Sequence, residues 1–319
     1  MEKEELRWHC KRLWSAETMT DVFELIEIYK NCLFTMFRIL RRFPTDSRAV
    51  ADAKLLPQMM FTKLSHLEQA CYGINYITRD GSSKLNTIID PSVVATLIRS
   101  VFEAVGIYNL IYLQPQTADE KLIVYNLWVI SGLKYRQGFS TYLTKEETKT
   151  KSQAEKDLIE KYINEIEETE VYQSLDPKDK EKLLGQIKQK KFQVHFDNGK
   201  PAILKGFQDI ALKAGYRENI MGAMYTYFSL NAHPSNVSVF QFEQMFSSTA
   251  PVFGTTVIFN LKNVFFLLGG FIADLTKLFP EAKVAFETLP ILDQCVINYL
   301  NVFSRTDSHS INEIFKNLE

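Results

Sequence analysis

The chain has 319 residues, of which 46% are hydrophobic and 24% charged, the profile of a folded globular protein with one large or two ordinary domains. A formal net charge of -1 gives no global attraction for nucleic acid or an anionic membrane. The four cysteines are far apart and lack CxxC spacing, which argues against zinc and disulfide frameworks and favours the cytoplasm.

Helix signals dominate the N-terminal half. Pro57 is expected to break or kink one of its helices. Asp90-Pro91 is a strong helix start, and Thr117 to Glu120 reads as a capping box. The helices predicted from these signals and from apolar spacing cover 21–42, 46–78, 91–113 and 118–141.

The middle of the chain, residues 145–191, is rich in Lys and Glu and has only a thin apolar stripe. We expect a solvated helical hairpin or a mobile arm, which could recruit a protein partner. Its basic run, 188–191, could touch phosphate, but such runs are usually solvated, so nucleic-acid binding is not the prediction. Residues 192–199 alternate like a strand and end in turn residues, and they fit a strand or a loop equally well.

Helix signals return after Pro201. Residues 237–246 are ambiguous between helix and strand. Lys262 lies at the centre of the most apolar segment, which favours a buried core helix over a membrane span. Pro280 is expected to separate two long helices and Pro290 to kink the second. The predicted helices cover 203–214, 216–233, 251 to about 303, and a terminal segment from a capping box at 310–313.

These elements predict an all-α fold, a multi-helix bundle with a charged helical hairpin or arm in the middle. Residues 1–143 and 201–319 would form the N-terminal and C-terminal parts of the same bundle. Residues 144–200 would be the charged insertion.

Tyr225, Ser229 and His233 recur every four residues, so they lie on one helix face. His233 precedes Pro234 and therefore sits at the helix C-terminus, where the dipole favours a charged imidazole. They are candidate ligand-binding residues, with His233 also a candidate acid or base. The alternative is that each satisfies a neighbour in the packed bundle.

Arg99 and Glu103 lie one turn apart in the very apolar helix 91–113. An arginine held by a carboxylate is suited to binding an anion or phosphate. The alternative is a narrow solvent stripe that includes Ser92 and Thr96. No histidine has a partner at metal-ligand spacing, and no phosphate-binding glycine loop is present, so no metal or cofactor is predicted.

The Arg99-Ser100-x-x-Glu103 helix, followed by Tyr225, Ser229 and His233-Pro-Ser, resembles a family of mostly bacterial, all-helical proteins known only as a domain of unknown function. The resemblance covers about 59–303 and implies that the five side chains share one site. It supplies no activity.

Three functions stay open from the sequence. The first is a binding or regulatory protein with a polar pocket for an anionic or nucleotide-like ligand. The second is a metal-independent ribonuclease distantly similar to the HEPN superfamily, using His233 with Arg99, or Arg305 with His309, whose spacing is shorter than that superfamily's. The third is a helical scaffold for protein partners. The sequence gives no oligomeric state.

Overall fold

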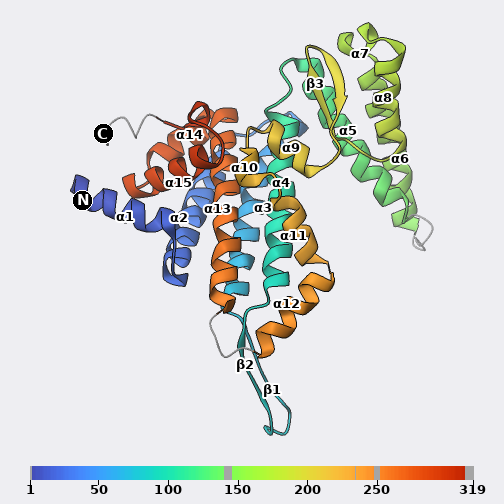
Figure 1. Cartoon of the computed structure of the whole chain (residues 1–319). Coiled ribbons are helices and arrows are strands. Elements are labelled where there is room, and N and C mark those ends of the chain that lie inside the picture. The colour runs from blue at the N-terminus through green and yellow to red at the C-terminus, as the bar shows by residue number, and fades with distance from the viewer. Residues whose placement is uncertain (1, 140–145, 234, 248–251, 313–319) are drawn as a thin grey trace. The chain divides into compact units, whose positions relative to one another are not determined.

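The computed structural model describes residues 2–139, 146–233, 235–247 and 252–312, which are predominantly helical (Figure 1). The predicted all-α class is confirmed. The chain divides into two units: Met1–Gly106 with Ala211–Glu319, and Ile107–Ile210. The charged segment predicted over 144–200 falls within the second unit, which also includes helix α5 (Ala118–Gln137).

The first unit begins with three helices whose start signals are local. They are α1 (Lys3–Ser15), α2 (Met19–Leu40) and α3 (Arg48–Cys71). Thr18 and Asp21 form a capping box on α2, and the Ser47 hydroxyl accepts the Val50 N–H on α3. Pro57 lies buried within α3 and does not end it. The prediction of a break there is therefore wrong, although the helix loses one hydrogen-bond donor.

A β-hairpin follows α3 where the sequence predicted more helix. Strands β1 (Ile74–Ile77) and β2 (Lys84–Ile88) pair antiparallel. Helix α3 ends at Cys71, and two residues later Gly73 has φ +72°, which is outside the helical region. A Cβ at Gly73 would lie 2.7 Å from the Ile88 carbonyl oxygen, so this turn out of the helix requires a glycine. All four residues of β1 are exposed, so burial supplies no amphipathic signal for this strand.

The long apolar helix α4 (Pro91–Tyr112) begins at the predicted aspartate-proline pair. Asp90 Oδ1 accepts the Ser92 N–H at 2.8 Å. The predicted helix 216–233 is instead two short helices, α10 (Glu218–Met221) and α11 (Met224–Ala232). The ambiguous segment after it is helical, α12 (Asn236–Ser247).

Three helices complete the first unit. They are α13 (Val252–Leu278), α14 (Pro280–Glu287) and α15 (Ile291–Ser304). Pro290 is the N-cap of α15, so it separates two helices rather than kinking one. The core lies around α13, which packs on α2, α14 and α15. A 3-10 turn (Asp307–His309) follows, and the predicted terminal helix falls largely outside the described residues.

The described residues of the second unit form four complete helices and a short hairpin. The elements are α5 (Ala118–Gln137), α6 (Glu146–Glu167), α7 (Glu170–Ser174), α8 (Pro177–Lys188), β3 (Val194–Asp197) and β4 (Lys200–Ile203). Asn198 and Gly199 both have positive φ, which suits a tight hairpin turn, so residues 192–199 include a strand. A further helix, α9 (Phe207–Lys213), crosses the boundary between the units.

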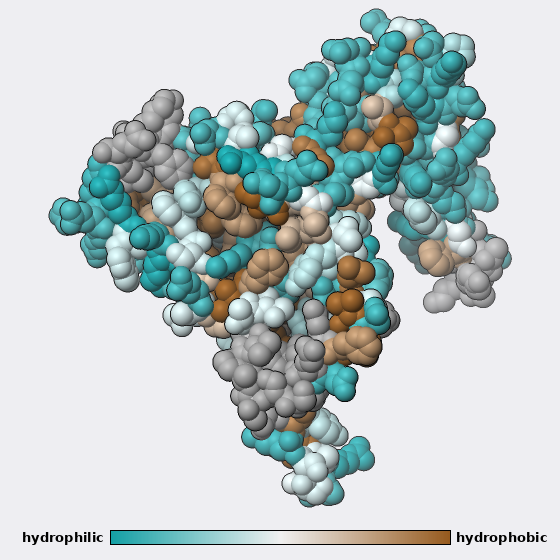
Figure 2. All heavy atoms as spheres, viewed as in Figure 1, coloured by the Kyte–Doolittle hydropathy of each residue, from teal (hydrophilic) through white to brown (hydrophobic). Residues whose placement is uncertain are grey.

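The charged middle packs on α5 through few side chains. Along α6 only Ile159 and Ile166 are buried, while the surface over this unit is mostly hydrophilic (Figure 2). This agrees with the thin apolar stripe in the sequence. Helix α6 packs on the apolar side chains of α5, which precedes the predicted insertion. The second unit therefore begins at Ile107 rather than at residue 144.

Two described helices, Pro91–Tyr112 and Thr255–Leu278, are long and apolar enough to cross a membrane by length and composition alone. In each, most of the apolar window is buried inside the protein, 67% and 72% respectively. Core helices give the same pattern, so this is weak evidence for a membrane span.

Candidate functional site

Arg99 and Glu103 lie on the first-unit part of α4 and pair with each other. The Arg99 Nε donates to Glu103 Oε1 at 3.0 Å, as the one-turn spacing allows. Their side chains are 26% and 31% exposed. The pair is therefore half-buried, and solvent reaches both groups.

Tyr225 and Ser229 lie on α11, and His233 is its C-cap. The backbone leaves the helix at His233, with φ -104° and ψ 150°, and its N–H donates to the Ser229 carbonyl oxygen. The predicted position of His233 at a helix C-terminus is confirmed. Its side chain is exposed.

Hydrogen bonds join the two helices across more than 120 residues of sequence. Arg99 Nη2 donates to the Tyr225 hydroxyl at 3.1 Å, and that hydroxyl donates to Glu103 Oε1 at 3.0 Å. Arg99 Nη1 lies 2.9 Å from His233 Nε2. The Arg99 guanidinium carbon also lies 5.3 Å from the Tyr225 ring centroid. We call Arg99, Glu103, Tyr225 and His233 the arginine cluster.

The hydrogen bonds fix two chemical properties of the arginine cluster. A guanidinium only donates, so His233 Nε2 must accept and the ring proton must lie on Nδ1. Arg99 has five N–H donors and uses three of them. The other two have no partner among the described residues. They remain for a ligand.

Burial and charge act against each other on Tyr225. Burial raises the pKa of the Tyr225 hydroxyl, the Arg99 hydrogen bond lowers it, and the Glu103 carboxylate raises it again. The net pKa is raised, so the phenol keeps its proton and its donor role. Burial lowers the Arg99 pKa, but Tyr225 and Glu103 together outweigh burial and leave it raised.

Ser229 does not join the cluster through its side chain. Its hydroxyl donates to the Tyr225 carbonyl oxygen at 2.7 Å, within its own helix. The predicted proximity of Arg99 and Glu103 to Tyr225 and His233 is therefore present, while Ser229 lies on the same helix with its hydroxyl used locally.

Arg305 and His309 are not arranged as an exposed catalytic pair. Arg305 Nη1 donates to Asp274 Oδ1 at 2.8 Å, and these side chains are only 3% and 5% exposed. Arg305 Nη2 also donates to the Ala214 carbonyl oxygen. Burial, with the charges of Arg305 and Lys277, lowers the pKa of His309 to about 4. Arg305 is thus a buried structural cation.

Within the described residues there is no group of three or more His, Cys, Asp or Glu side chains placed to hold a metal ion. All four cysteines are buried and free. The pKa of Cys32 and Cys71 is raised by burial, that of Cys71 to about 12, which keeps these thiols protonated.

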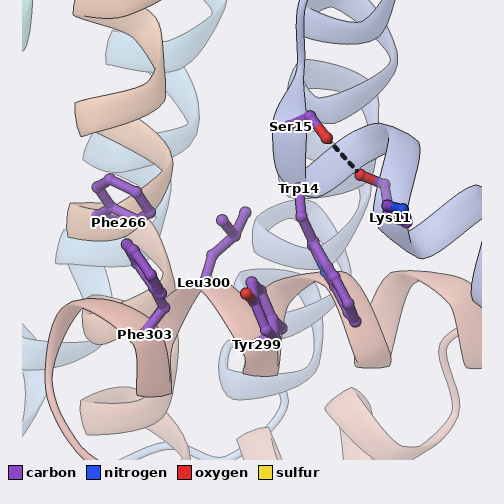
Figure 3. A pocket seen from close by; sticks show the side chains of 7 residues that line it. All are labelled: Lys11, Trp14, Ser15, Phe266, Tyr299, Leu300 and Phe303. Carbon is purple, nitrogen blue, oxygen red and sulfur yellow. Dashed lines mark hydrogen bonds between the residues drawn. The ribbon is translucent and has the colours of Figure 1, made fainter.

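Sequence reasoning missed an aromatic groove on the first unit (Figure 3). It has a volume of about 280 Å³, and Trp14 from α1, Phe266 from α13 and Tyr299 from α15 contribute to its lining. The Trp14 and Tyr299 rings stack with centroids 3.7 Å apart. These residues lie on three separate helices, so no local motif indicates the groove.

Comparison with protein families, with curated proteins and with solved structures found no significant match to this chain. The resemblance based on the Arg-Ser-x-x-Glu and His-Pro-Ser motifs stays a prediction.

Proposed function

We propose that the protein binds an anionic, phosphate-bearing ligand at the arginine cluster and acts as a binding or regulatory protein. The observation that carries this proposal is the Arg99 guanidinium, fixed by three different side chains with two N–H donors left over. Arg305 also makes three hydrogen bonds, to Asp274 and to two backbone carbonyl oxygens, but its side chain is only 3% exposed, so solvent and ligands cannot reach it. The Arg99 side chain is 26% exposed, so its remaining N–H groups are accessible.

The cluster prepares Arg99 for an oxyanion. Glu103 and Tyr225 hold the guanidinium plane, which reduces the rotamer freedom lost when a ligand binds. A planar guanidinium with two free N–H groups matches two oxygens of a phosphate. The Glu103 carboxylate would repel an incoming anion. Its negative charge is offset by the hydrogen bonds that it accepts from the Arg99 guanidinium and from the Tyr225 hydroxyl.

His233 gives the site a second donor. Its Nδ1 carries the ring proton when Nε2 accepts from Arg99. An anion that takes over the Arg99 N–H would release Nε2 from its hydrogen bond. Phosphate binding should therefore change the environment of the His233 ring nitrogens.

The test is a titration with inorganic phosphate in which the NMR signals of the imidazole rings are monitored. The chain has five histidines, and His233→Gln assigns the relevant signals. Phosphate should shift the His233 ring nitrogens selectively. Arg99→Lys keeps the charge but loses the planar fork, and it should weaken phosphate binding about tenfold.

Arg79→Lys is the matched control, because Arg79 is exposed on the β1–β2 hairpin and forms no ion pair with a described residue. It should bind phosphate like the unsubstituted protein. Unchanged His233 signals up to high phosphate concentration, or equal affinity in Arg99→Lys, would refute the proposal.

A ribonuclease is the second candidate, and one observation favours it. Among the described residues, the hydrogen-bonded arginine–histidine pair is Arg99 with His233, which could supply phosphate stabilisation and an acid or base. RNA cleavage that is lost in His233→Gln and kept in Arg79→Lys would support it. A bacterial source, a cytoplasmic location and a protein partner for the 145–191 segment stay predictions from the sequence.

A further inference from the structure

The end of α2 and the loop that follows carry an unbalanced positive charge. Arg38, Arg41 and Arg42 are exposed, and none forms an ion pair with a residue in the described parts of the chain. Arg38 lies three and four residues before the others, so all three share one side of the helix end and repel one another. The helix dipole offsets part of this repulsion.

Nearby acidic residues do not neutralise this patch. Between residues 38 and 54 the chain has five cations and two acids, Asp46 and Asp52. Asp52 already pairs with Arg48 at 3.0 Å. An anion from solution would therefore be attracted to the end of α2.

A cavity of about 460 Å³ opens beside these arginines, and its lining includes Arg41, Phe43, Thr45 and Lys54. This volume falls within the range of small-molecule sites, roughly 300 to 1,000 Å³. We call this cavity, formed by the end of α2, the loop and the first half of α3, the basic cavity.

Phe43 offers the basic cavity a stacking surface. Its side chain is 44% exposed, and its ring packs on no other described aromatic ring. Phe37 differs, because it packs against Phe34 and Phe61 with ring centroids 4.9 and 5.8 Å away. The Phe37 ring is therefore held by its neighbours, whereas the exposed Phe43 ring is available to stack on a planar ligand.

Polar donors line the same cavity. Lys54 Nζ donates to the Phe43 carbonyl oxygen at 2.5 Å and lies 5.7 Å from the Phe279 ring centroid, which fixes the ammonium in place. An ammonium has three N–H donors, so two remain. The Thr45 oxygen accepts the Ser47 N–H at 3.2 Å, and its own proton goes to no described residue.

We propose that the basic cavity binds a phosphorylated ligand with a planar aromatic ring, the chemistry of a nucleoside phosphate. The ring stacks on Phe43, and the phosphate contacts Arg41 and Lys54. Arg38 and Arg42 add long-range attraction. This site shares no residue with the arginine cluster and stands independently of the function proposed there.

The test is calorimetric titration with AMP, adenosine and inorganic phosphate. AMP should bind, and adenosine or phosphate alone should bind the basic cavity at least about tenfold more weakly, because each lacks one of the two contacts there. Phe43→Ala and Arg41→Ala should each weaken AMP binding about tenfold. Both positions are exposed, so the variants should melt like the unsubstituted protein.

Arg79→Ala is the control, and it should keep AMP affinity, because Arg79 is exposed on the β1–β2 hairpin and does not line the basic cavity. Loss of AMP binding in Arg99→Ala with full binding in Arg41→Ala would overturn this proposal and place AMP at the arginine cluster. Equal affinity for adenosine and AMP would also overturn it, because the cations would then play no part. The proposal would also be overturned if the unsubstituted protein did not bind AMP.

Discussion

Replacing Arg99 by alanine separates a ligand-binding arginine from a structural one. The substitution removes the hydrogen bonds to Glu103, His233 and Tyr225. Glu103 keeps the Tyr225 hydroxyl as a donor and stays partly hydrated. The carboxylate is therefore not left as an isolated buried charge.

The structure sets the expected magnitude. A surface ion pair at i,i+4 spacing contributes about 0.3 to 0.5 kcal/mol, and a hydrogen bond about 1 kcal/mol. Because water replaces part of each lost contact, Arg99→Ala should lower the free energy of unfolding by about 1 to 2 kcal/mol. Arg305 gives the comparison within the same unit. It is buried with Asp274, and removing one partner of such a pair costs about 3 to 5 kcal/mol.

Urea unfolding of the two variants, followed by tryptophan fluorescence in a Trp128→Phe background, measures this difference in the first unit, because the remaining tryptophans, Trp8 and Trp14, lie on α1. Arg99→Ala should stay folded and lose the phosphate response of His233, whereas Arg305→Ala should be strongly destabilised. Equal, large losses of stability in both variants would refute the reasoning and identify Arg99 as a core residue. A folded Arg99→Ala with an unchanged phosphate response would remove Arg99 from ligand binding.

Two further predictions concern pH and mobility. Folding holds the His309 pKa at about 4, below the roughly 6.5 of an unfolded chain, so the unfolded state takes up the proton first and stability should fall as pH drops from about 6.5 to 4. His309→Gln should show a shallower loss in thermal melts over this range, and an identical pH profile would contradict the assignment. Amides in residues 146–158 of α6 should exchange with deuterium faster than those of α13, because the buried residues of α6 are confined to Ile159 and Ile166. Equal protection would show that α6 belongs to a rigid core.

Local signals in the sequence determined most helix positions. Thr18, Asp90, Thr117 and Asp176 each accept backbone N–H groups at a helix start. These contacts span three residues or fewer, so the sequence contains all the information that they need. The one-turn pairing of Arg99 with Glu103 is local in the same sense. Motifs in the sequence also led to the expectation that Tyr225 and His233 share their site.

Tertiary structure decided the features that depend on distant residues. The helix predicted through residue 78 ends at Cys71, because the chain turns at Gly73 with φ +72° and pairs as a strand with residues near Ile88. No local pattern in the sequence predicts that Arg305 is buried, yet its guanidinium donates to Asp274 and to the Ala214 carbonyl oxygen, both distant in sequence. The basic cavity exists because the chain turns after α2 and brings Lys54 back to Phe43. Apolar periodicity predicts which face of a helix is buried, but which side chains meet across two helices follows from packing that no local pattern specifies.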